Sequence, residues 1–171
     1  MGKSIFVTVG TTLFEKLIAA TTTREALQWM QSNAYSRLVI QYGKGTFPSL
    51  PKDAANFVSD IEMYTFKPTL HQDMVDADLI ISHAGAGTVH EAAKLRKQLV
   101  VVINTELMDN HQTELAHAMG ERRHLFVVES PKEMAKMEMW DRFQNFAPEP
   151  YSGGDDQDFP RIIDTLVGFS R

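Results

Sequence analysis

The chain has 171 residues, a length that favours one domain with a substantial buried core. Its formal net charge of -5 argues against nucleic acid or an anionic membrane as a general partner, and the lack of cysteine excludes disulfides and thiolate metal sites. With 43% hydrophobic and 23% charged residues, the composition is typical of a soluble globular protein, which we expect in the cytoplasm.

Short apolar runs alternate with helical patterns along the chain. The predicted strands are 4–9, 38–42, 61–66, 79–81, 99–103 and 125–128. The predicted helices are 24–31 after a threonine cap, 69–77, 89–95, 108–119 before a stop at Gly120, one opened by Ser130 and Pro131, and 159–169. This alternation predicts an α/β, Rossmann-like parallel sheet with helices on both faces, whose ligands bind beyond the carboxyl ends of the strands.

The pattern also divides the chain into three parts. Residues 1–147 are predicted to form the α/β domain, and 148–158 an acidic linker that contains glycine and proline. Residues 159–171 are predicted to form an amphipathic C-terminal helix. This helix either packs back on the domain or docks a partner.

One stretch, from Asp78 to Ala93, combines the strongest functional signals. An apolar strand ends in the small-residue turn 85–88, which opens onto a helix. Unpaired N–H groups and the positive end of the helix dipole meet at such a point, which predicts a phosphate site. The alternative is that the glycines only allow the helix to pack tightly on the strand. The turn lacks the three spaced glycines of the dinucleotide fingerprint.

Polar residues near two of the predicted strand ends suit a sugar nucleotide. Glu91 lies near the start of the predicted helix, where its carboxylate has two oxygens for a ribose diol. The alternative is an acid in the first turn that only complements the helix dipole. Residues 108–112, Met-Asp-Asn-His-Gln, follow the next strand and offer an amide and an imidazole to sugar hydroxyls. The alternative there is helix capping by Asp109 or Asn110.

Three other patterns are weaker. The turn 43–46, Gly-Lys-Gly-Thr, lacks the upstream glycine of a P-loop and is predicted to be a solvated turn. Asp76 and Asp78 look like a metal-binding carboxylate pair, but they precede their strand and so lie at the wrong end of the sheet. The six histidines have no metal-ligand spacing, and the chain has no G-x-S-x-G elbow.

Four blocks together resemble one protein family. They are 6–12, 38–43, 77–88 and 101–104 with 107–112, in this order along the chain. They are similar to the catalytic subunit of the eukaryotic dolichol-pathway UDP-N-acetylglucosamine transferase, a member of glycosyltransferase family 28. The bacterial transferase that adds GlcNAc to the peptidoglycan lipid carrier belongs to the same family.

The resemblance implies a fold, a reaction and a partner. The fold would be the donor-binding half of a GT-B glycosyltransferase, with the acceptor-binding half supplied by a membrane-anchored subunit at the cytosolic face of the endoplasmic reticulum. The reaction would be inverting transfer of GlcNAc from UDP-GlcNAc to GlcNAc-diphospho-dolichol. The resemblance implies neither a metal nor another cofactor.

The resemblance also implies roles for individual residues. The donor-binding positions are Gly10, Thr11, Thr12, His83, Gly85, Ala86, Gly87, Thr88, Glu91, Asn110, His111 and Gln112. Among them Glu91 matches the ribose-binding acid, and His111 and Gln112 match the positions that contact the sugar. Phe66 and Lys67 fall near the expected uracil position. His83 is a candidate for the catalytic base, but we expect the base on the partner or at the interface.

Two other functions remain as alternatives. One is a bacterial exopolysaccharide transferase subunit of the same two-chain design that uses another UDP-sugar. The other is a UDP-sugar-binding module that has lost catalysis.

Overall fold

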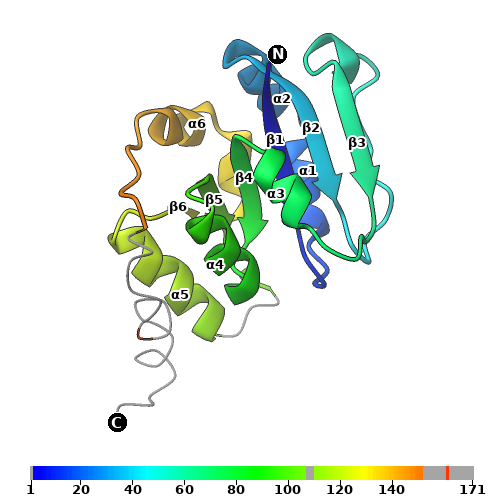
Figure 1. Ribbon diagram of the computed structural model, residues 1–171. Coiled ribbons are helices and arrows are strands. Elements are labelled where there is room, and N and C mark those ends of the chain that lie inside the picture. The colour runs from blue at the N-terminus through cyan, green and yellow to red at the C-terminus, as the bar shows by residue number, and fades with distance from the viewer. Residues whose placement is uncertain (1, 107–109, 152–160, 162–171) are drawn as a thin grey trace.

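The computed structural model describes residues 2–106, 110–151 and 161 of the chain. Its strands are β1 (Lys3–Thr8), β2 (Tyr35–Gln41), β3 (Asp60–Tyr64), β4 (Leu79–His83), β5 (Gln98–Val102) and β6 (Phe126–Val128). They form one parallel sheet in the order β3-β2-β1-β4-β5-β6 (Figure 1). All six predicted strands are confirmed, and the order is the doubly wound one of Rossmann-like domains.

Helices cover both faces of this sheet, as predicted. Three α-helices and a 3₁₀ helix share one apolar cluster with the sheet: α1 (Glu15–Thr21), α2 (Arg24–Ser32), η2 (Pro131–Ala135) and α6 (Met137–Gln144). Three helices share the other cluster: α3 (His71–Asp76), α4 (Ala86–Lys94) and α5 (Asn110–Glu121) (Figure 1). A short 3₁₀ helix, η1 (Ala54–Asn56), precedes β3.

The two clusters explain why most of the strands contain continuous apolar runs. Along β1, Ile5 and Val7 belong to the first cluster, whereas Phe6 belongs to the second. Successive side chains point to opposite faces of a strand, and both faces here are covered by helices. The residues from Ile5 to Thr8 are therefore buried whichever way they point, whereas β3, at the edge of the sheet, has no buried residue.

The structure differs from the sequence prediction at three helices. α1 was not predicted, because it is only seven residues long and ends in threonines. α4 begins at Ala86 rather than at Val89. Gly120 lies inside α5 and does not stop it. A Cβ atom at Gly120 would lie 2.6 Å from Cγ2 of Val127, so this glycine lets α5 approach β6 closely.

The last described helix packs against an early one. Trp140 of α6 stacks on Trp29 of α2, with ring centroids 4.4 Å apart, and the Nε1–H of Trp140 donates to the carbonyl of Met134 at 2.8 Å. Both rings are buried in the first cluster. Residues more than a hundred positions apart are therefore joined by one aromatic contact.

The predicted division at the C-terminal end is only partly visible. Of the predicted linker, residues 148–151 are described, and Tyr151 is buried with its ring edge-on to His124. Residues 152–160 and 162–171 lie outside the described part, so the linker and the C-terminal helix stay predictions. Among the helices that the structure describes, none is both long and apolar enough to span a bilayer.

Candidate functional site

The carboxyl edge of the sheet brings two of the predicted glycine positions together around one histidine. β1 and β4 are paired neighbours, so the loops that follow them lie side by side. A Cβ atom at Gly10 would lie 3.0 Å from Cε1 of His83, and one at Gly85 would lie 2.4 Å from its Nε2. Both positions therefore need glycine, because the imidazole fills the space where a side chain would be.

His83 is the last residue of β4 and is 7% exposed. Burial lowers the pKa of its imidazole, and an interaction with the Thr8 backbone opposes this only in part. The ring is therefore neutral at pH 7. A general base has to accept a proton, which burial makes unfavourable here, so the structure gives the base assignment of His83 no support.

The start of α4 is open. Gly85 is the N-cap, no side chain caps the helix, and the first intrahelical bond runs from the Val89 N–H to the Gly85 carbonyl at 3.0 Å. The N–H groups of residues 86–88 therefore have no acceptor within the helix. A Cβ atom at Gly87 would meet no described atom within 4 Å. Tight packing therefore explains Gly85 but not Gly87, where the described residues leave room for a side chain.

A glutamine that the sequence analysis missed fixes the loop after β1. The Oε1 atom of Gln41 accepts hydrogen bonds from the N–H groups of Gly10 at 2.8 Å and Val9 at 3.1 Å. Its Nε2 donates to the carbonyls of Gly10 and Thr65, each at 2.8 Å. Gly10 has φ +60, a left-handed conformation that favours glycine. Gln41 thus ties the loops after β1 and β3 to the end of β2.

Glu91 is the sixth residue of α4, and the first turn of this helix contains no acid. The alternative that Glu91 complements the helix dipole is therefore wrong, because that effect is confined to the first turn. Its Oε1 atom lies 2.7 Å from Nδ1 of His71 in α3. Its side chain is 40% exposed and accessible to a ligand.

The remaining predicted positions lie in the loops and helices at the same edge. Thr12 donates from its hydroxyl to the Val9 carbonyl at 2.7 Å, and Thr11 is exposed. α5 begins at Asn110, and the His111 side chain is 62% exposed. Asp109 lies outside the described residues. Contacts of His111 and Gln112 with a sugar stay a prediction.

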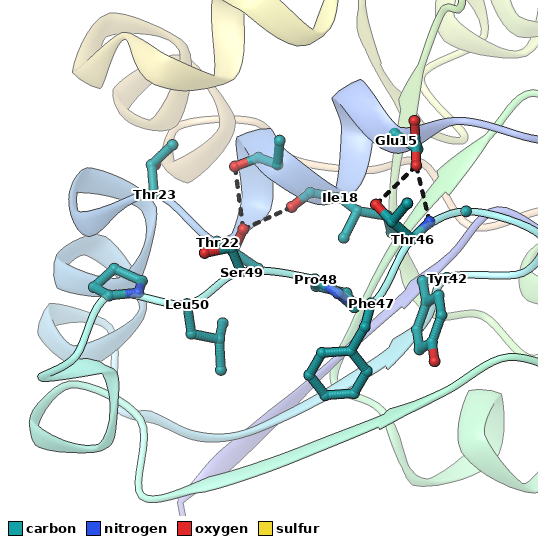
Figure 2. A pocket seen from close by; sticks show the side chains of 13 residues that line it. Glu15, Ile18, Thr22, Thr23, Tyr42, Thr46, Phe47, Pro48, Ser49 and Leu50 are labelled. Atoms are coloured by element: carbon teal, nitrogen blue, oxygen red, sulfur yellow. Dashed lines mark hydrogen bonds between the residues drawn. The ribbon is translucent and has the colours of Figure 1, made fainter.

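The second glycine-rich turn, 43–46, differs from the turn 85–88 because a carboxylate of the protein accepts its hydrogen bonds. Oε1 of Glu15 accepts from the Thr46 N–H at 2.8 Å and from its hydroxyl at 2.9 Å (Figure 2). These bonds lower the pKa of Glu15. The turn borders a groove of about 580 Å³. Tyr42 and Phe47 both line this groove, and their rings pack edge to face.

The rejected metal motif lies at the opposite edge of the sheet. Oδ2 of Asp78 accepts a hydrogen bond from the N–H of Ser4, near the start of β1, at 2.8 Å. Asp78 thus lies between α3 and β4 and bonds to the neighbouring strand β1, at the edge where the sequence placed it. Within the described residues, no three His, Asp or Glu side chains form a metal-binding group.

Comparison with known proteins identifies the family. The model of the glycosyltransferase family 28 C-terminal domain matches residues 4–137. This chain belongs to that family.

Curated relatives from human and from Yarrowia lipolytica carry the same name. The human UDP-N-acetylglucosamine transferase subunit ALG13 is 47% identical over 124 residues, which are 72% of this chain but 11% of the human protein. The Yarrowia lipolytica subunit of the same name is 31% identical over 165 residues, covering 96% of this chain and 84% of that protein. The resemblance to the UDP-N-acetylglucosamine transferase subunit is therefore confirmed.

Solved structures show the same fold. An NMR solution structure of ALG13 matches with a TM-score of 0.70 and 24% identity, covering 97% of this chain and 98% of that one. The crystal structure of Acinetobacter baumannii MurG matches with a TM-score of 0.62 and 19% identity, covering 98% of this chain and 50% of that one. The fold is that of one half of a GT-B glycosyltransferase, as predicted.

Proposed function

We propose that this chain is the donor-binding, catalytic subunit of an inverting UDP-GlcNAc transferase. Its acceptor is GlcNAc-diphospho-dolichol, bound by a membrane-anchored partner that recruits the chain to the cytosolic face of the endoplasmic reticulum. The relatives are named as subunits of a UDP-N-acetylglucosamine transferase, which supports UDP-GlcNAc as the donor and a second subunit as the partner. The observation that carries the proposal is the uncapped start of α4 at the carboxyl edge, with Glu91 on the second turn of the same helix.

The chemistry assigned to this edge begins with the leaving group. As the bond to the sugar breaks, negative charge develops on the β-phosphate of UDP. Preorganised N–H groups and the positive end of a helix dipole stabilise such charge. The N–H groups of residues 86–88 provide both without a metal ion, and Gly87 leaves room for the phosphate to approach.

Two further tasks remain for the transfer. The sugar has to be held in line for attack, a task that we assign to His111 and Gln112 at the start of α5. A base has to take the proton of the acceptor hydroxyl. We assign this base to the partner, because the His83 ring is buried against Gly10 and Gly85, and this burial lowers its pKa.

Donor binding is tested first. We expect titration calorimetry to show that the purified chain binds UDP and UDP-GlcNAc, with UDP-galactose and UDP-glucuronic acid as competitors that bind less tightly. The substitution Glu91→Gln should lower the affinity for UDP by about tenfold or more, because the charged acceptor of the ribose hydrogen bonds is lost. Glu138→Gln, an exposed acid at the start of α6, is the matched control. A chain that binds no UDP, or whose affinity does not depend on Glu91, contradicts the proposed site.

Transfer is tested second. The purified chain alone should transfer almost no GlcNAc to a GlcNAc-diphospho-lipid acceptor, whereas the complex co-purified with its membrane partner should do so. Full activity of the chain alone would contradict the two-subunit proposal. UDP-GlcNAc binding without transfer by the complex would instead support a module that has lost catalysis.

A further inference from the structure

The helix that precedes β4 in the chain, α3, shares an apolar cluster with α4 and brings a side chain to the proposed ribose site. His71 is the first residue of α3, and its Nδ1 lies 2.7 Å from Oε1 of Glu91, twenty residues further along the chain. A carboxylate oxygen only accepts hydrogen bonds, so at this distance Nδ1 carries the hydrogen and donates it. Nδ1 carries that hydrogen both in this neutral tautomer and in the protonated ring.

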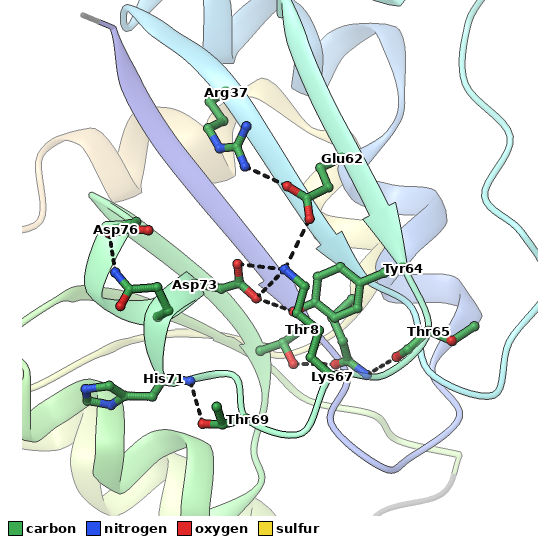
Figure 3. A network of polar contacts seen from close by, with 12 residues as sticks. Thr8, Arg37, Glu62, Tyr64, Thr65, Lys67, Thr69, His71, Asp73 and Asp76 are labelled. Carbon is green, nitrogen blue, oxygen red and sulfur yellow. Dashed lines mark hydrogen bonds and ion pairs between the residues drawn. The ribbon is translucent and has the colours of Figure 1, made fainter.

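His71 is itself held in place by the loop before α3. Its backbone N–H donates to Oγ1 of Thr69 at 3.2 Å. Nζ of Lys67 lies 3.1 Å from both Glu62 and Asp73, and Asp73 also accepts from the Tyr64 hydroxyl at 2.5 Å (Figure 3). These contacts join β3, the loop and α3 into one network. The backbone that presents His71 is therefore fixed from both sides.

The charge of Lys67 stabilises this network. Burial by itself lowers the pKa of Lys67, but its bonds to Asp73 and Glu62 outweigh burial and raise it. The lysine is therefore fully charged at neutral pH. Its ammonium also lies 4.1 Å from the centre of the Tyr64 ring, a favourable cation–π geometry. Gln41 adds a link to the loop after β1 through the Thr65 carbonyl.

We propose that His71 is a positioning residue, which orients the Glu91 carboxylate for the two hydroxyls of a ribose and so sets a preference for ribonucleotides over deoxyribonucleotides. This inference rests on the proposed donor site. A glutamate on a helix surface samples several rotamers, and binding a diol would have to select one of them. A hydrogen bond that selects the rotamer beforehand reduces this cost. The carboxylate has about four lone-pair sites, so the bond from His71 leaves acceptor positions for the ligand.

Two other roles of the contact give different results. As a surface pair, with side chains 56% and 40% exposed, it would contribute little to stability and nothing to binding. As a competitor that occupies Glu91 in the empty site, His71 would weaken binding, and its removal would raise the affinity. Only the positioning role predicts a loss of affinity that depends on the ribose hydroxyls.

The test compares UDP with 2′-deoxy-UDP by titration calorimetry on the full chain. His71→Ala should lower the affinity for UDP by about threefold to tenfold and the affinity for 2′-deoxy-UDP much less. The preference for UDP over 2′-deoxy-UDP should therefore become smaller. His71→Asn should retain most of the preference, because its Nδ2 lies close to the position of Nδ1. His117→Ala is the matched control, because it removes a similarly exposed contact, 2.8 Å from Glu129, elsewhere on the chain. The melting temperatures should agree within about 2 °C, as expected for surface positions.

The outcomes separate this inference from the proposed function. If the wild-type chain does not bind UDP, or does not distinguish it from 2′-deoxy-UDP, the ribose site itself is wrong. That result contradicts both the proposed donor site and the positioning role of His71. If Glu91→Gln abolishes the preference and His71→Ala leaves it intact, only the positioning role is contradicted. Tighter UDP binding by His71→Ala would also contradict the positioning role. In a Glu91→Gln background, His71→Ala should have no further effect, and a further loss also contradicts the inference.

Discussion

The two glycine-rich turns of this domain look alike in sequence and behave differently in the structure. Both follow strands at the carboxyl edge of the sheet, and both combine glycines with a threonine. In the turn 43–46, Glu15 accepts hydrogen bonds from Thr46, so a carboxylate of the protein occupies the anion position. At the turn 85–88 no side chain caps the helix, and Gly87 faces open space.

This difference shows what makes a glycine turn a site for a ligand. Glycine only lets the backbone come close, and the N–H groups then bond to whatever acceptor is nearest. A turn that finds its acceptor within the protein is a structural feature. A turn whose N–H groups stay unpaired at a helix N-terminus keeps its affinity for an external anion. Substitutions in the two turns test this contrast.

The largest effect is expected from placing a carboxylate in the open turn. In Gly87→Asp the new acid would stand where we place the phosphate, and two like charges about 4 Å apart repel by several kcal/mol near a protein surface. UDP affinity should fall at least about 100-fold in titration calorimetry. The melting temperature should not fall, because an acid in the first turn of a helix is favourable. Gly87→Asn is the neutral control, and equal affinities of the two variants would refute the anion site.

The two glycines of the open turn should also respond differently to alanine. Gly85→Ala places a Cβ against the His83 ring and should lower the free energy of unfolding by about 1–3 kcal/mol. Gly87→Ala meets open space within a helix and should raise it by up to about 1 kcal/mol. Urea unfolding measures both. Equal effects would mean that packing does not distinguish the two positions.

A smaller effect concerns pH. The folded-state pKa of His83 lies below its ordinary value of 6.5, so below that pH the unfolded chain binds a proton that the folded chain does not. Stability should therefore fall as the pH drops below about 6.5, by at most about 1.4 kcal/mol per pH unit for this one group. His83→Gln should flatten the slope in urea unfolding between pH 7.5 and pH 5. An unchanged slope would show that other groups cause it.

The smallest effect is expected at the closed turn. The folded-state pKa of Glu15 is lowered, so its contribution is present above the ordinary value of 4.5 and is lost as the pH falls through the folded value. Glu15→Ala should lower the melting temperature slightly at pH 7, and the difference should vanish on strong acidification. Glu15→Gln, which keeps an acceptor, should lose less. Neither variant should change UDP affinity, and a change would link the two turns.

The sequence predicted the strands well and the side-chain partners poorly. Most strands contain a continuous apolar run because helices bury both of their faces, and such runs are visible without a structure. β3 is the exception, because it carries Asp60 and Glu62 and is exposed or half-buried throughout. Gln41 and His71 were missed because their partners are 31 and 20 residues away, where no local pattern points to them. The start of α4 was placed three residues late because Gly85 and Gly87 resemble a loop there. That shift made Glu91 look like a first-turn acid.

The stacked Trp29 and Trp140 have a practical consequence for spectroscopy. They are the two tryptophans of the chain, and they belong to the cluster on the face of the sheet opposite α4. Their emission therefore reports whether α6 is docked on α2, an event that involves distant parts of the chain. Because the pair lies away from the open turn, adding UDP should leave the emission spectrum unchanged. Intrinsic fluorescence thus follows folding without interference from the ligand.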